Sequence, residues 1–405
     1  MALSPVNSWD TRLLIAAEST FGTAAVPADV AAYAATAVEH IDADLGEVEQ
    51  GATRGKADRN LGRGMQSAFV EGRVPPIPWK VSLSCKSRSA IDAVPREGTA
   101  IYKAAGLTQT VNGSTSYTLT PSATPIESGD FVSATLRRFE GSGSAAFEAE
   151  TLRGCIAEKL VWSGGDKEVM LEATGRGIGK YHQGSIDSIT LASGVVTSVT
   201  HTAAESYLLD TGYYLCESEI ISIARAGVGY GSTSSTITRA QLASSGVAHS
   251  AKALYPYIPT GITFAGSPIA EPNATVSIGG VTTRVLSWSA EFTTGMGLLS
   301  GETGSAYVQG AKYGRYDLAI SCRLVLSGTQ VQLLNKATQR ATAGALAVSL
   351  SQGTGTGAVW TLASTYCELM PFKVPSTPND IAIVDVKLRV RDNASGNNAF
   401  SIVLT

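Results

Sequence analysis

The sequence is poor in charged and aromatic residues. Of its 405 residues, 16% are charged and 7% are aromatic. The 31 Lys and Arg residues nearly balance the 34 Asp and Glu residues, which gives a net charge of -3. A chain with this balance lacks the broad positive field on which tight DNA binding depends, so we expect no dedicated nucleic-acid-binding function.

Cysteine and histidine are scarce as well. The five cysteines are Cys85, Cys155, Cys216, Cys322 and Cys367. Because their number is odd and no C-x-x-C occurs, the sequence indicates neither a zinc ribbon nor a disulfide framework, and predicts buried free thiols in a reducing cytoplasm. The four histidines are scattered and form no H-E-x-x-H pattern, so we expect neither a metal nor another cofactor.

Long apolar runs and catalytic motifs are missing too. Glycines, serines and threonines interrupt the uncharged stretch 341–367, which excludes a membrane helix there. The apolar run 13–17 is too short for a signal-peptide core. Residues 175–180 resemble a phosphate loop but lack its first glycine and its final Ser or Thr, so we interpret them as a strand-exit turn. With no G-x-S-x-G motif either, we expect no enzyme.

Glycine, serine and threonine are abundant instead, a composition that favours turns and strands. Within this β-rich pattern, two segments recur in the same order. Residues 67–73 (SAFVEGR) match 305–311 (SAYVQGA), and residues 79–86 (WKVSLSCK) match 316–323 (YDLAISCR). The nearly constant spacing predicts an internal duplication.

Each copy is predicted to hold alternating strands, a short helix and a closing strand pair. We expect residues 38–180 and 262–405 to superpose, with Val81 matching Leu318 and Cys85 matching Cys322. The predicted helices cover 98–105 and 329–341, the second capped by Thr329. The predicted closing pairs are 157–162 with 168–173, and 381–390 with 399–404.

A segment of different texture separates the two copies. Residues 186–260 are dense in Ser and Thr and are predicted to form an inserted small β module, exposed on the outer surface and dispensable for assembly. The predicted organisation is an N-terminal arm (1–37), a first β domain (38–185), the inserted module (186–260) and a second β domain (261–405).

Charge is patterned in one place. An acidic stretch contains Glu39, Asp42, Asp44, Glu47 and Glu49, and a basic stretch follows with Arg54, Lys56, Arg59 and Arg63. Two interpretations stand side by side: a solvated hairpin, or complementary surfaces on neighbouring subunits, with the acidic one possible as the lining of a channel. The matching loop of the second half is apolar, with Met296, Leu298 and Leu299 as candidate hydrophobic contacts.

The N-terminal run 9–27 (WDTRLLIAAESTFGTAAVP) resembles the start of tail tube proteins, the major tail proteins of long non-contractile-tailed bacteriophages. Later landmarks of that family appear in order at 104–107 (AAGL), 117–122 (YTLTPS) and 152–160 (LRGCIAEKL), and more loosely in the second half. In the insert, Glu219, Arg239 and His249 lie in segments similar to a small module of several phage structural proteins.

The resemblance implies a mainly β fold, with two copies of a tail-tube β-sandwich or barrel, short flanking helices and the inserted module. It implies a virion subunit, assembled in the host cytoplasm, that forms stacked rings around a tape-measure protein. Its other partners would be tail terminator and tail-tip proteins, with double-stranded DNA passing through and no membrane contact. A duplicated chain would need three copies per ring, with six as the alternative. A tail-tip, distal-tail or hub adaptor is the second interpretation, and a bacterial surface protein the third.

The basic stretch gives the first testable prediction. Reversing Arg54, Lys56, Arg59 and Arg63 to Glu is expected to leave the subunit folded but unable to elongate, because each ring junction repeats the same small losses of about 0.2–1 kcal/mol per ion pair. Electron microscopy of the purified variant checks it. Normal tubes at every salt concentration would contradict the predicted contact.

Overall fold

The computed structural model describes residues 11–25, 37–46, 53–54, 70–71, 76–87, 98–113, 116–193, 196–223, 231–259, 266–270, 272–299, 310–340, 346–355, 358–372, 381–391 and 399–405. The fold is mainly β, as predicted, and its sheets are antiparallel. In this part of the chain, no helix combines the length and apolarity needed to cross a membrane.

The elements of the first half run from β1 to β12. They are β1 (Thr11–Ala17), β2 (Ala37–Val38), β3 (His40–Asp44), β4 (Thr53–Arg54), β5 (Val70–Glu71), β6 (Ile77–Ser84), α2 (Thr99–Ala104), β7 (Leu107–Asn112), β8 (Ser116–Pro121), β9 (Ala134–Ser142), β10 (Ala145–Gly165), β11 (Met170–Gly177) and β12 (Gly179–Gly184).

The module and the second half follow. The module has β13 (Ile186–Leu191), β14 (Ser198–Thr200), a 3-10 turn η2 (Glu205–Tyr207), β15 (Gly212–Cys216), β16 (Glu219–Ile223), β17 (Ser234–Thr238) and β18 (His249–Pro256). The second half has β19 (Thr275–Ile278), β20 (Val281–Thr293), β21 (Met296–Leu299), β22 (Gly310–Tyr313), β23 (Asp317–Ser327), α3 (Gly328–Arg340), β24 (Leu346–Gly353), β25 (Val359–Leu369), β26 (Ile381–Val390) and β27 (Ser401–Leu404).

Each half forms a closed ring of strands. In the first barrel β1, β9, β10, β11, β6 and β3 pair in that order, and β2, just before β3, closes the ring on β1. In the second barrel the order is β19, β24, β25, β26, β23 and β20, with β20 closing on β19. β12 and β27 also match, since β12 pairs with β10, and β27 pairs with β25, which holds the place of β10 in the second barrel.

The two barrels therefore share both chain order and pairing. Val81 lies opposite Ala173 on β11, and Leu318 lies opposite Val390 on β26, so Val81 and Leu318 occupy matching places. In each barrel a two-stranded ribbon comes next in the chain after a matching strand. The ribbon β4–β5 follows β3, and the ribbon β21–β22 follows β20. This is the topology that a duplication produces; the superposition of the two barrels stays a prediction.

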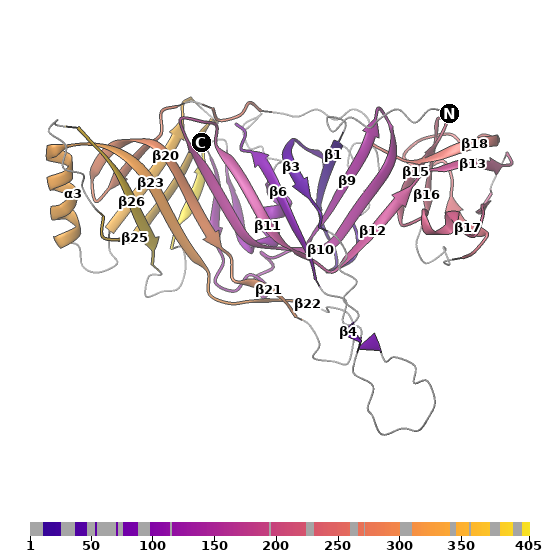
Figure 1. Cartoon of the computed structure of the whole chain (residues 1–405), viewed down its shortest axis with the longest axis horizontal. Coiled ribbons are helices and arrows are strands. Elements are labelled where there is room, and N and C mark those ends of the chain that lie inside the picture. Colours follow the sequence, from indigo (N-terminus) through magenta and orange to yellow (C-terminus); the bar gives the residue numbers. More distant parts are fainter. Residues whose placement is uncertain are drawn as a thin grey trace, which may run out of the picture.

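Strand β10 joins the two barrels. Its residues from Lys159 to Gly165 pair with β20, which makes one continuous sheet of β3, β6, β11, β10, β20, β23 and β26. Figure 1 shows β6, β11, β20, β23 and β26 following one another across the molecule. A second link comes from β27, which pairs with β8 of the first half.

The core lies behind this sheet. Alternate residues point inward, as the two-residue period of a strand requires, and the buried set includes Trp162, Trp288 and Trp360. The rings of Trp288 and Trp360 stack with centroids 4.5 Å apart, inside the second barrel. All five cysteines are free and buried, as predicted.

Both predicted helices are present, with one change of cap. Ser327, not Thr329, begins α3: its hydroxyl accepts the Gln330 amide hydrogen, and the Gln330 side chain accepts from the Ser327 amide, a reciprocal capping box. Leu334 is buried against the core and Val331 packs beside it.

The predicted N-terminal arm is partly a barrel strand. Residues 11–17 form β1, because Leu13 and Ile15 enter the core and the whole strand pairs with β9. Glu18 anchors the chain just after it: its buried carboxylate accepts hydrogen bonds from the Ser133 and Thr135 hydroxyls and from the Gly22 and Gly154 amides, at 2.6–2.8 Å. Glu18 belongs to the run that resembles tail tube proteins.

Two other local predictions need correction. The first closing pair is a β10–β11 hairpin, but β26 and β27 do not pair with each other, because β27 crosses to lie between β25 and β8. The glycine-rich segment 175–180 is a bend within a strand pair, not an exit turn: β11 ends at Gly177 and β12 resumes at Gly179 along the same partner, β10.

The module has its own six-stranded sheet, in the order β13, β18, β15, β16, β17 and β14, and its own core. It also packs on the outer side of the first barrel. The shared apolar cluster contains Leu14, Phe139, Ala146, Ala149, Tyr213, Ile220, Leu242, Tyr257 and Ile258. Deleting the module would expose the four barrel residues of this cluster to solvent. The prediction that the insert is dispensable for assembly does not account for this loss of buried apolar surface. Figure 1 places the module at one end of the molecule and α3 at the other.

One buried side chain secures the joint between the barrels. The Gln352 carbonyl oxygen accepts hydrogen bonds from the Gly165 amide (2.7 Å) and the Trp288 indole (2.8 Å), and its NH2 group donates to the Lys167 carbonyl (2.6 Å). Gln352→Leu leaves these three groups buried without that partner, so we expect a loss of about 1–3 kcal/mol in unfolding free energy. Denaturant unfolding measures it.

The control for this variant is Gln109→Leu, which removes a half-buried hydrogen bond to the Thr99 carbonyl. A loss from Gln352→Leu no larger than that of the control would show that the joint does not depend on this side chain.

Candidate functional site

Two strand edges of the continuous sheet are unpaired within the described residues. At one end, β3 pairs with β6 and has no second strand partner among the described residues, although the Arg138 side chain donates to the Ala43 carbonyl at 3.1 Å. At the other end, Glu368 and Leu369 of β25 pair with β26 on one side. On the other side the pairing with β24 ends at Cys367, opposite Leu346, and residues 341–345 lie outside the described residues. Open edges are templates for pairing with another chain.

These two edges match the two strands that are already joined inside the chain. β3 holds the place in the first barrel that β20 holds in the second, and the end of β25 holds the place of the end of β10. Asp42 thus corresponds to Glu291, and Glu368 to Val161, and Glu291 and Val161 are directly opposite in the β10–β20 joint. The chain contains one copy of a joint and the two halves of another.

Exposed apolar side chains accompany the open edges. Ile41 on β3 is 60% exposed, and Met370, directly after β25, is 42% exposed. A strand added at either edge would cover this apolar surface.

The outward face of the continuous sheet is polar, and we call it the polar face. Three ion pairs cross between neighbouring strands on it: Lys80–Glu172 (2.8 Å), Lys159–Glu291 (2.7 Å) and Asp317–Arg389 (3.0 Å), with side chains 40–49% exposed. Serines separate them, among them Ser82, Ser163, Ser289 and Ser321. The opposite-charge arrangement follows from register, because each pair lies on a diagonal between adjacent strands.

The predicted acidic residues do not form one surface. Asp42 and Asp44 lie on β3 opposite Ser82 and Lys80, which places them on the polar face. Glu39 instead forms an ion pair with Lys86, whose side chain is buried. Glu47 and Glu49 lie outside the described residues.

The structure describes only some of the residues that are predicted to form contacts between rings. Arg54 lies in β4, opposite Val70 of β5, while Lys56, Arg59 and Arg63 lie outside the described residues. In β21, Leu298 and Leu299 are half-buried, whereas Met296 is 5% exposed and lies beside Gly106 of the first barrel. Met296 therefore packs within its own chain, which corrects its predicted role as a contact between rings; for Leu298 and Leu299 the role stays a prediction.

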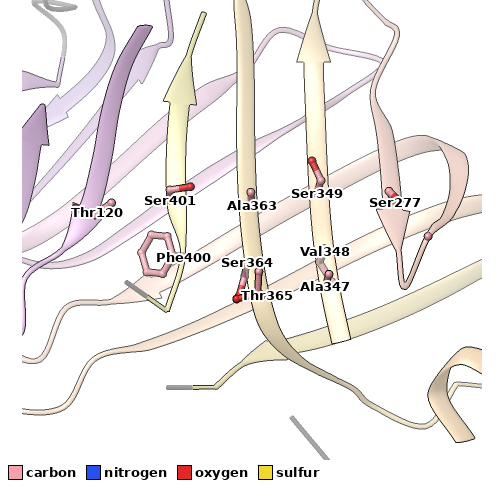
Figure 2. Close-up of a pocket in the computed structure, with 11 residues that line it drawn as sticks. Thr120, Ser277, Ala347, Val348, Ser349, Ala363, Ser364, Thr365, Phe400 and Ser401 are labelled. Carbon is pink, nitrogen blue, oxygen red and sulfur yellow. The ribbon is translucent and has the colours of Figure 1, made fainter. Parts of the chain in front are cut away.

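A hollow of about 600 Å³ lies on the other layer of the second barrel, across β19, β24, β25, β27 and β8 (Figure 2). Its lining is small and uncharged: Ser, Thr, Ala, Val, a glycine and Phe400. Charge is thus concentrated on the polar face and is absent from this lining. The hollow offers no charged group that could act as an acid or base.

One cluster has the donors for a metal ion. Glu148, Glu150 and His182 bring ligand atoms within 4.8 Å of one another. Glu150 is already neutralised by Lys180 at 2.8 Å and Arg138 at 2.9 Å. Two cations within ion-pair distance compete with any metal, so we interpret the cluster as an ion-pair network between β9, β10 and β12.

The module contains a second charge network around Glu219, in which Glu219, Arg239 and His249 are buried and Glu217 is half-exposed. Arg239 donates to both Glu219 oxygens at 2.8 and 2.5 Å, and the Ala240 and Val247 amides add two further hydrogen bonds. His249 lies between two carboxylates, with its ring nitrogens 2.8 Å from Glu219 and 2.9 Å from Glu217.

Backbone strain surrounds the same network. Among the described residues, the non-glycine residues with positive φ, between 50 and 63°, are Glu217, Ala240, Leu242, Ala243 and Ala251. Such conformations persist only where neighbouring contacts fix them. The residues that resemble a module of phage structural proteins, Glu219, Arg239 and His249, are the ones that hold this loop; their spacing in the sequence gave no sign that they meet.

The network predicts acid sensitivity of the module. Burial by itself raises the pKa of Glu219, but the hydrogen bonds from Arg239, His249 and the two amides outweigh burial and lower the pKa to about 2. Because the pKa of Glu219 is lower in the folded state than in the unfolded state, its ionised form stabilises the fold at pH values above the unfolded pKa of about 4.3. This stabilisation is lost as the pH falls toward 2. We expect hydrogen exchange of β16 and β18 to accelerate over that interval.

Glu219→Gln is expected to remove most of this pH dependence and to cost about 1–3 kcal/mol at neutral pH, since the amide cannot accept from all its neighbours. Glu205→Gln, at a half-exposed turn of the same module, is the control. An unchanged pH profile in the Glu219 variant would contradict the proposed role of the carboxylate.

No family model matches the chain, and no match was found among curated proteins.

Proposed function

We propose that the chain is a structural virion subunit that polymerises into stacked rings, forming the tail tube of a long non-contractile-tailed bacteriophage. The single observation that carries this proposal is the repeated joint. β10 and β20 unite two barrels within the chain, and at its two ends the matching segments, β3 and the last two residues of β25, have a strand partner on one side only among the described residues. Identical copies that join by the same rule form a closed ring.

Ring size follows from the strand count. Each chain contributes eight strands to the continuous wall: β3, β6, β11, β10, β20, β23, β26 and the end of β25. Three chains at about 4.8 Å per strand give a circumference of about 115 Å, hence a backbone diameter of about 37 Å before strand tilt widens it. That channel admits a DNA duplex. Three chains with two barrels each also give six similar units around the axis.

The remaining partners follow from the same proposal. A tape-measure protein would fill the channel during assembly, terminator and tail-tip proteins would cover its ends, and DNA would pass without specific binding. The module, which covers the outer side of β1, β9 and β10 through Leu14, Phe139 and Ala149, would face away from the channel.

A tail-tip, distal-tail or hub adaptor on the same scaffold is the alternative. The firmly docked module favours it, because an additional fixed domain suits a subunit that connects two different structures. Negative-stain microscopy distinguishes the two functions: long tubes support the repeating subunit, and single discrete rings support the adaptor. Monomers under all conditions would count against both.

The proposed joint makes a sharp cross-linking prediction. By the register of the internal joint, Asp42 of one copy lies opposite Glu368 of the next, as Glu291 lies opposite Val161 within the chain. Asp42→Cys with Glu368→Cys should form disulfides between chains on mild oxidation, giving dimers and trimers in denaturing electrophoresis. The native thiols interfere little, because burial raises the pKa of Cys322 to about 12 and that of Cys367 to about 11.

Two matched variants control this experiment. Val161→Cys with Glu291→Cys should cross-link within one chain, and Asp42→Cys with Asp385→Cys, which moves one thiol away from the open edge, should not form the ladder. A ladder that continues to six chains would refute the three-chain ring, and one no stronger than the Asp385 control would refute the joint.

A further inference from the structure

In the matching ion pairs of the polar face, the positions of the cation and the anion are exchanged between the two barrels. Lys80 and Asp317 occupy matching places on β6 and β23, and Glu172 and Arg389 occupy matching places on β11 and β26. The first barrel therefore carries its cation where the second carries its anion. Each pair is preserved although both of its members have changed sign.

This reversal keeps the face balanced around a ring. Three cations of the face have a carboxylate oxygen 2.7–3.0 Å from the nitrogen: Lys80 with Glu172, Lys159 with Glu291, and Arg389 with Asp317. On the same face, Arg323 lies opposite Asp385, and Lys387 lies opposite Ser321. A cation that is already paired offers little to a phosphate, since binding would first have to break the pair. Affinity for DNA depends on cations free to replace condensed counterions.

The polar face is also the side that a ring would turn inward. The side chains on the opposite side of the same strands, such as Val81, Leu171 and Leu318, are buried beneath the second layer. The module covers the outer face of that second layer. A ring needs more circumference outside than inside, so the layered side fits outside and the uncovered polar face fits inside.

We propose that the polar face is a charge-balanced channel wall along which duplex DNA moves without being held, an inference that rests on the proposed tube function. It replaces the acidic lining expected from the sequence. Repulsion by a uniformly acidic wall would vary with ionic strength, whereas alternating paired charges leave little net field at a distance longer than the spacing of the pairs. Passage along this wall should therefore depend little on salt.

The test unbalances the wall and measures DNA binding. A variant with Glu172→Gln, Glu291→Gln and Asp317→Asn leaves three cations per chain without partners. We expect it to bind a short duplex at least tenfold more tightly than the unaltered protein at low salt, with affinity falling steeply as salt rises. Fluorescence anisotropy with labelled duplex DNA measures both quantities.

The control removes the same charge elsewhere. Glu127→Gln, Glu148→Gln and Asp187→Asn, all outside the polar face, should change DNA binding by less than twofold. The mirror variant, Lys80→Gln, Lys159→Gln and Arg389→Gln, should gain no binding, which keeps the inference testable if the first variant folds poorly. Tight DNA binding by the unaltered protein, or equal gains in the first variant and its control, would overturn the charge-balanced wall.

Microscopy of the same samples separates this inference from the proposed function. If the unaltered protein forms neither rings nor tubes, the tube proposal fails regardless of the binding data. If it forms tubes and the first variant binds no more DNA than its control, the tube proposal stands and the charge-balanced wall fails.

Discussion

The antiparallel pairing of β10 with β20 is the contact on which the rest of the structure depends. It converts two closed barrels into one continuous sheet, and it fixes the register of every strand on either side. Gln352 then holds the end of β10 against Trp288 from behind. Together with the pairing of β27 with β8, this joint gives the open edges and the polar face defined positions.

A sheet buried on one side carries apolar residues on its inner side and polar residues on its outer side. In this sheet the two sides have different roles. Inward positions carry tryptophans and aliphatic side chains that bind the layers together. Outward positions carry serines and cross-strand ion pairs, each worth little to stability in water. Their value under the proposed function would lie in keeping a large surface soluble and without net attraction for a polyanion.

Two buried carboxylates fix the local conformation of the chain by accepting several hydrogen bonds each. Glu18 secures the chain after β1 by accepting four hydrogen bonds, and Glu219 gathers Arg239, His249 and two amides into a strained loop. A buried charge is tolerated only when its hydrogen-bonding capacity is met. In each case the carboxylate fixes a local conformation of the chain.

The sequence by itself determined the β-rich class, both helices, the buried thiols, the separate module and the matching of Val81 with Leu318, because each of these depends on local periodicity, composition or direct repetition. Only the tertiary structure decided that residues 11–17 form a barrel strand, that β27 pairs with β8, and that Met296 is buried in the first barrel. The same holds for the pairing of Lys80 with Glu172 and of Asp317 with Arg389. These features join residues tens to hundreds of positions apart, and no local pattern specifies which strand lies beside which; that choice is made when the apolar faces of both barrels are buried together.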